Sequence, residues 1–78
     1  MIDLKTPILT PRQKEIATLT ANGYTMDQIA VELGISPRTV MQTNIEARER
    51  MGSRLGVEMV NATQMVAWAV KLGEIEVG

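Results

Sequence analysis

The sequence predicts a small all-α domain of four short helices. Four residues that commonly cap helix N-termini each stand just before an apolar pattern of helical period: Thr10, Thr25, Ser36 and Asn61. The 78 residues include one Trp, one Tyr and no Phe, so the core must be built from Ile, Leu, Val, Ala and Met. A core of that composition suits short, closely packed helices.

The first helix is predicted over 11–22. Thr10 is the expected N-cap, Pro11 takes the first helical position, and Gln13 completes a capping box. The apolar stripe consists of Ile16, Ala17 and Leu19. Gly23 then provides a left-handed residue that ends the helix.

The second helix, over 26–33, repeats the capping box with Thr25 and Gln28. Gly34 ends it, and Ser36 opens a third helix only two residues later. Two helices so closely joined must turn sharply, which predicts a helix-turn-helix arrangement with the start of the third helix exposed.

The third helix is predicted to begin at Pro37 and to end at Gly52. One face carries residues at spacings of three and four, which are Val40, Thr43, Ala47 and Met51. The opposite face carries Arg38, Met41, Gln42, Ile45 and Arg48. The connection 53–60 that follows is long and rather apolar.

The fourth helix starts after Asn61, with Gln64 at the third position, and ends before Gly73. Its inward face is predicted to hold Met65, Val66, Ala69 and Leu72. We therefore expect a flexible N-terminal arm at 1–8, one domain at 9–75 and a tail at 76–78.

Composition argues against several classes of function. The chain has no Cys and no His, which removes disulfides, the usual zinc ligands and the usual general base. We expect no enzyme activity, no metal or other cofactor and no small-molecule ligand. No apolar run approaches the roughly 20 residues that span a bilayer, so a soluble cytoplasmic protein without membrane contact is expected.

The net charge of −1 and the pI of about 5.3 count against nucleic-acid binding, which usually needs a basic surface. The charge is unevenly distributed, however. Four arginines stand between positions 38 and 54 against two glutamates: Arg38, Arg48, Arg50 and Arg54 against Glu46 and Glu49. Patterning alone leaves both a DNA-reading domain and an inert helical bundle open. The sharp turn, with Arg and Thr in the helix that follows it, favours DNA.

The sequence also resembles a known family. The segments that carry the resemblance are Leu9–Gln13, Gly23–Thr25, Gln28–Ala30, Leu33–Ser36, Arg38–Val40, Ala47–Gly52 and Thr63–Ala69. They are similar to the four-helix LuxR-type (GerE-like) helix-turn-helix DNA-binding domain, over about 9–75. The resemblance implies a transcription regulator, with the third helix as recognition helix in the major groove and the fourth helix at a dimer interface. Neither a receiver nor a ligand-sensing domain fits in this length, so a stand-alone form is expected.

Carried over from the family, three residues would meet base edges: Met41, Gln42 and Ile45. Family members usually have a basic residue where this chain has Met41, and often one where it has Ile45. Gln42 can pair with adenine, and the two apolar side chains can contact thymine methyl groups, which predicts a preference for A·T pairs. The residues expected at phosphates are Thr25, Arg38, Thr39 and Arg48.

Some residues have a second interpretation. Arg48 can pair with Glu46 or Glu49 on a solvated face, and Met41 and Ile45 can be covered by the long connection. Trp68 is predicted at the axis of a homodimer, with Lys71 beside it and Met65 in support. Alternatively, Trp68 belongs to the core.

The sequence thus predicts a sequence-specific regulator that binds double-stranded DNA, as a dimer. The alternative is a protein-interaction module that binds RNA polymerase or another regulator and inhibits it. Its contact patch would consist of Met41, Ile45, Leu55, Val57 and Met59.

Overall fold

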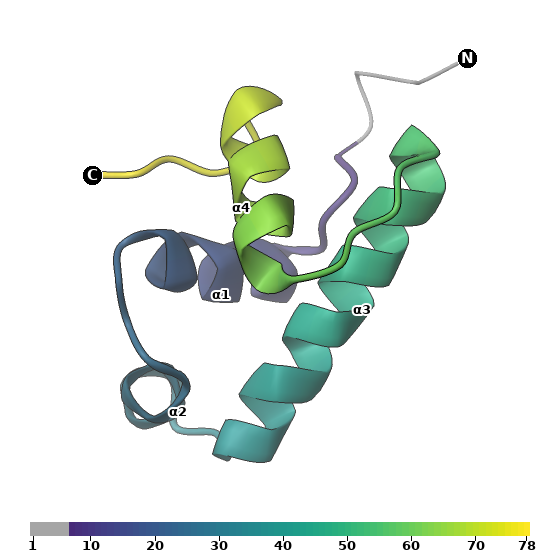
Figure 1. Cartoon of the computed structure of the whole chain (residues 1–78). Helices are drawn as coiled ribbons and strands as arrows, with labels where there is room; N and C mark the ends of the chain where they lie inside the picture. The colour runs from purple at the N-terminus through teal and green to yellow at the C-terminus, as the bar shows by residue number, and fades with distance from the viewer. Residues whose placement is uncertain (1–6) are drawn as a thin grey trace.

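The computed structural model describes residues 7–78, and this part of the chain contains four α-helices and no strand (Figure 1). The helices are α1 (Pro11–Ala21), α2 (Met26–Leu33), α3 (Pro37–Leu55) and α4 (Ala62–Lys71). The prediction of an all-α, four-helix fold is confirmed. Positions 1–6 of the predicted arm lie outside the described residues.

Each helix starts where its capping residue predicts. In α1 the Thr10 hydroxyl accepts from the Gln13 N–H (3.2 Å), while the Gln13 side chain accepts from the Thr10 N–H (3.0 Å). Thr25 and Gln28 form the same capping box at α2, with distances of 3.2 Å and 2.8 Å. Ser36 caps α3 and Asn61 caps α4. These bonds satisfy N–H groups that have no partner inside the helix.

The turn between α2 and α3 depends on one glycine. Gly34 has φ 67° and ψ 35°, a left-handed conformation that costs glycine little. The next N–H, of Ile35, donates to the carbonyl of Ala30 at 3.0 Å and closes the turn. A small cluster lies beneath it and joins the first three helices; its buried members are Ile16, Ile29, Ala30 and Val40.

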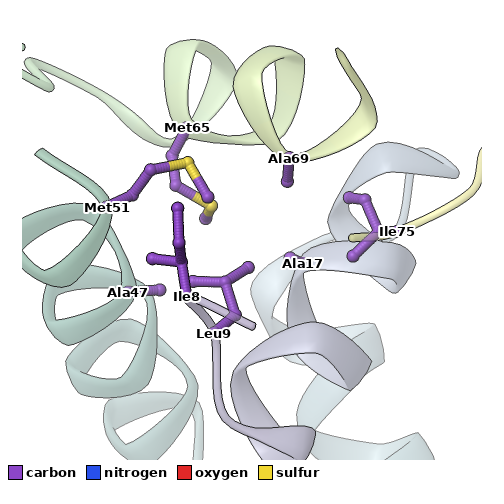
Figure 2. Close-up of a cluster of buried hydrophobic side chains, with 8 residues drawn as sticks. All are labelled: Ile8, Leu9, Ala17, Ala47, Met51, Met65, Ala69 and Ile75. Carbon is purple, nitrogen blue, oxygen red and sulfur yellow. The ribbon is translucent and has the colours of Figure 1, made fainter. Parts of the chain in front are cut away.

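A larger cluster joins α1, α3, α4 and both ends of the described chain. Its buried side chains are Ile8, Leu9, Ala17, Ala47, Met51, Met65, Ala69 and Ile75. Figure 2 shows Met51 and Met65 reaching toward each other from α3 and α4, with Ile8 and Leu9 between the helices.

The N-terminal boundary differs from the one predicted. Ile8, expected at the end of a flexible arm, is only 3% exposed. The Glu74 carboxylate accepts hydrogen bonds from the backbone N–H groups of Ile8 (2.8 Å) and Leu9 (2.9 Å). The packed part of the chain therefore begins before the predicted boundary at position 9, because the segment entering α1 completes the core.

The end of α3 also differs from the prediction. The helix continues through Gly52 to Leu55 and closes at Gly56, whose φ is 67°. A Cβ at Gly52 would lie 2.8 Å from the carbonyl oxygen of Val57, so this glycine permits a close approach of the chain instead of ending the helix. The non-helical connection is therefore 56–61, and three of the eight residues of the predicted connection, 53–55, are helical.

None of the helices in residues 7–78 has the length and hydropathy needed to cross a membrane.

Candidate DNA-binding face

α3 is amphipathic, and its inner face fixes its position in the domain. Val40, Ala47 and Met51 are at most 1% exposed, and Thr43 is half-buried. The opposite face is therefore directed away from the core. Packing against α1 and α2 through Val40 leaves the first two turns of α3 accessible from outside.

The three predicted base-contact residues lie on this outer side, to different degrees. Met41 is 44% exposed and Gln42 is exposed, while Ile45 is half-buried. The interpretation that the connection covers both apolar side chains thus fails for Met41. Ile45 lies beside a hollow shared with Val57 and Met59, so the connection borders it.

The predicted phosphate contacts at the helix starts are accessible. Thr25, Arg38 and Thr39 are exposed. Thr25 is the N-cap of α2, and the Thr39 hydroxyl lies 2.9 Å from the hydroxyl of Ser36. Arg38 and Thr39 line a shallow hollow with Gln42, which places these two groups beside a predicted base-contact residue.

Arg48 has a more defined environment than its neighbours. It is half-buried, and its Nη1 donates to the carbonyl oxygen of Val60 at 3.1 Å. Its Nε is buried without a hydrogen-bond partner. Arg48 is thus held by the connection rather than by Glu46 or Glu49. Arg50 is used differently, because its Nε donates to the carbonyl oxygen of Ile8 in the N-terminal segment.

Residues that the sequence did not associate with this face also border it. A hollow of about 270 Å³ is lined by Met26, Met41, Asn44, Ile45, Arg48, Asn61 and Ala62. It brings the starts of α2 and α4 to the middle of α3. The sequence marks Asn61 as a cap, but no local pattern shows which part of α3 it approaches.

The predicted dimer residues do not share one surface. Met65 is fully buried between α3 and α4, so its assignment to an interface is corrected. Trp68 is half-buried and packs against the larger cluster, so part of its side chain belongs to the core, while its role in a dimer stays a prediction. The Nζ of Lys71 lies 5.2 Å from the centre of the Trp68 ring, which is a cation–π contact. Ala67 and Val70 are exposed on the same helix.

The outer face of α3 combines exposed arginine, amide, hydroxyl and apolar groups. Such groups can reach base edges and phosphates together. In residues 7–78 no three His, Cys, Asp or Glu side chains gather closely enough to hold a metal ion.

Comparison with known proteins agrees with this arrangement. A family model described as "Bacterial regulatory proteins, luxR family" (GerE) matches residues 7–67. The chain is 37% identical over 51 residues to the transcriptional regulatory protein UhpA of Escherichia coli (strain K12), which covers 65% of this chain and 26% of UhpA. It is 36% identical over 53 residues to UhpA of Salmonella typhimurium (strain LT2), covering 68% of this chain and 27% of that protein. The matched segment thus spans about a quarter of each relative.

The family match includes all of α1, α2 and α3 and the first half of α4. The resemblance inferred from the sequence is therefore confirmed. LuxR-type helix-turn-helix domains bind DNA, and the exposed face of α3 is compatible with that activity. The chain belongs to the luxR family of bacterial regulatory proteins and carries the DNA-binding domain of a transcription regulator.

Proposed function

We propose that this domain recognises specific sequences in double-stranded DNA by placing the N-terminal half of α3 in the major groove. The observation that supports this most directly is the contrast between the two faces of α3. Val40 and Ala47 anchor one face in the core, while Arg38, Met41 and Gln42 are exposed on the other. The major groove of B-DNA is wide enough to admit one α-helix.

Gln42 pairs with adenine in this proposal, and Met41 contacts a thymine methyl group. Ile45, which is half-buried, contributes at the border of the contact. Arg38, Thr39 and Arg48 contact phosphates, joined by Thr25 at the start of α2. The predicted preference for A·T pairs depends on the absence of Arg or Lys at the three base-facing positions.

Selection of bound sites from random duplexes tests the proposal. We expect sites with A·T pairs where α3 enters the groove. Gln42→Ala should make the free energy of binding less favourable by about 1–3 kcal/mol and relax the base preference at one position of the site. Arg38→Ala should weaken binding to all duplexes alike. Arg12→Ala is the matched control, because Arg12 is exposed on α1 and pairs with Glu15. A G-rich selected site, or equal losses for Arg12→Ala and Arg38→Ala, would contradict the proposal.

We further propose that two copies associate through the outer side of α4. Met65 is excluded by its burial, so this surface consists of Ala67, Val70, Lys71 and the accessible part of Trp68. A second copy would add DNA contacts that a small domain with few exposed cations lacks.

Binding to RNA polymerase or another regulator is the second candidate function. The patch expected for it loses two members, because Leu55 and Met59 pack against the core. A different surface favours this function: Val31 is 84% exposed on α2, beside a hollow that also contains Asp27 and Glu32. This function would be supported if the wild-type domain captures purified RNA polymerase and shifts no DNA duplex, and if Val31→Glu abolishes the capture. A duplex shift insensitive to Val31→Glu would exclude it as the main function.

These proposals concern the domain itself. The prediction that it acts without a sensing domain stays a prediction.

A further inference from the structure

The connection 56–61 folds back along the C-terminal half of α3 before α4 begins (Figure 1). It passes over Gly52 at Val57 and meets Arg48, one turn earlier on α3, at Val60. The connection therefore borders the candidate DNA-binding face along more than a helical turn.

Gly52 makes this close passage possible. A Cβ there would lie 2.8 Å from the Val57 carbonyl oxygen and 3.4 Å from Cγ of Met59. The first distance is below the range of real Cβ contacts, and it involves backbone, which yields less easily than a flexible side chain. Any larger residue at position 52 must therefore push the connection away from α3.

Gln64 holds the connection from the other side. Its Oε1 accepts from the Val60 N–H at 2.9 Å, and its Nε2 donates to the Glu58 carbonyl oxygen at 2.9 Å. One side chain of α4 thus fixes the backbone on both sides of Met59. Its own backbone N–H is occupied separately, by the Asn61 cap at 2.8 Å.

The Val60 carbonyl oxygen fixed in this way is the group that holds Arg48. Met41, Ile45, Arg48 and Gly52 follow one another at spacings of four, three and four, so they form one line along α3. A guanidinium has five N–H donors, and Val60 takes one of them. An arginine already restrained by a carbonyl loses less conformational freedom when it binds a phosphate.

We propose that Gln64 and Gly52 are positioning residues for DNA binding, because they seat the connection whose Val60 carbonyl aims Arg48 at a backbone phosphate. This inference rests on the proposed DNA-binding function. It extends that function to one residue on each side of the connection, Gly52 on α3 and Gln64 on α4, neither of which is expected to touch DNA.

A double-mutant cycle tests the coupling. Binding of the 78-residue chain to a duplex selected with the wild type is measured by fluorescence anisotropy over a series of salt concentrations. Gln64→Ala removes both bonds to the connection and keeps the Asn61 cap, which uses the backbone N–H. We expect Gln64→Ala to weaken binding about threefold to tenfold. The slope of log affinity against log salt should become shallower by about 0.9 for each bound domain, as it should for Arg48→Ala. Adding Gln64→Ala to Arg48→Ala should cause little further loss.

Gly52→Ala reaches the same connection from α3 and should reproduce the loss of affinity and of salt slope. Alanine has a higher helix propensity than glycine, so Gly52→Ala should favour the helical conformation of α3 while it weakens DNA binding. Thr63→Ala and Ser53→Ala are matched controls on exposed neighbouring positions, and both should bind like the wild type. Circular dichroism of each variant confirms that it is folded.

Three outcomes would overturn the inference. Unchanged affinity in folded Gln64→Ala and Gly52→Ala would show that the connection does not position Arg48. Tighter binding would show that Val60 masks Arg48 instead. An equal loss with and without Arg48 would show that Gln64 acts independently of it.

If the wild type selects no duplex, the proposed function itself fails and the inference falls with it. A wild type that binds while the variants bind equally well removes the inference alone.

Discussion

Glu74 shows how one side chain can define a domain boundary. Its two carboxylate oxygens accept from consecutive N–H groups at the entrance to α1, 2.8 Å and 2.9 Å away. These groups belong to Ile8 and Leu9, whose side chains are buried. The partners are more than sixty positions apart in the chain, so no local pattern indicates the contact.

Replacing Glu74 by Ala should lower the free energy of unfolding by about 1–2 kcal/mol, because two part-buried N–H groups lose a charged acceptor. Urea denaturation measures this change. Glu76→Ala is the matched control, since Glu76 is exposed two residues later, and it should have almost no effect. Equal stability of the two variants would mean that the contact contributes nothing to folding.

Helical spacing predicted which side chains at the start of α3 are exposed, while their contacts with DNA stay a prediction. Spacing put Arg38, Met41 and Gln42 opposite the core, and all three are exposed. The assignment of Met65 to a dimer interface was wrong. Spacing grouped Met65 with Ala69 on the inward face, while the hypothesis of a dimer around Trp68 used it as a supporting residue, and its burial agrees with the spacing.

At the scale of elements, helix starts were predictable and one helix end was not. A start is fixed by groups within three residues of each other, such as Thr25 and Gln28, so the sequence contains the whole interaction. An end at glycine depends on conformation. Gly56 takes the left-handed conformation, whereas Gly52 stays helical and, by lacking a Cβ, leaves room for the connection. Sequence shows a glycine at both positions and does not show which requirement each one meets.

The turn between α2 and α3 should depend on conformation more than on space. Gly34 is left-handed, and no atom lies within 4 Å of the place where a Cβ would be. Gly34→Ala should therefore destabilise the fold by about 1–2 kcal/mol through backbone strain alone. Gly34→Asn should cost clearly less, because Asn adopts this conformation more readily. Thermal unfolding of the two variants provides the comparison, and the opposite order would show that packing controls the turn.

At the scale of the whole molecule, the outer side of α4 leaves apolar groups in solvent. Val70 is 40% exposed, next to the Trp68–Lys71 contact. If two copies meet here, Val70→Glu should convert a dimer to a monomer, because it places a carboxylate in each half of the interface. Light scattering measures the mass. Val31→Glu makes the same change on α2, where Val31 is 84% exposed, and should leave the mass unaltered. A monomeric wild type, or equal effects of the two variants, would end the dimer proposal.

The charge of the whole domain sets how DNA binding should respond to salt. Net charge is −1, and among the described residues Arg38 and Arg48 are the cations proposed to reach phosphates. Contacts through hydroxyls and backbone N–H groups neutralise no phosphate. The slope of log affinity against log salt should therefore be about −2 for one domain and about −4 for a dimer.

Anisotropy titrations on one duplex measure that slope, and Arg12→Ala should not change it, because Arg12 lies on α1 in an ion pair with Glu15. A slope steeper than about −6 would mean that further cations reach the backbone, so the proposed orientation of α3 would be wrong. A slope near −4 that becomes about −2 in Val70→Glu would support both the DNA-binding proposal and the dimer proposal in one measurement. The affinity of an acidic domain would then come from pairing two weakly charged faces on one duplex.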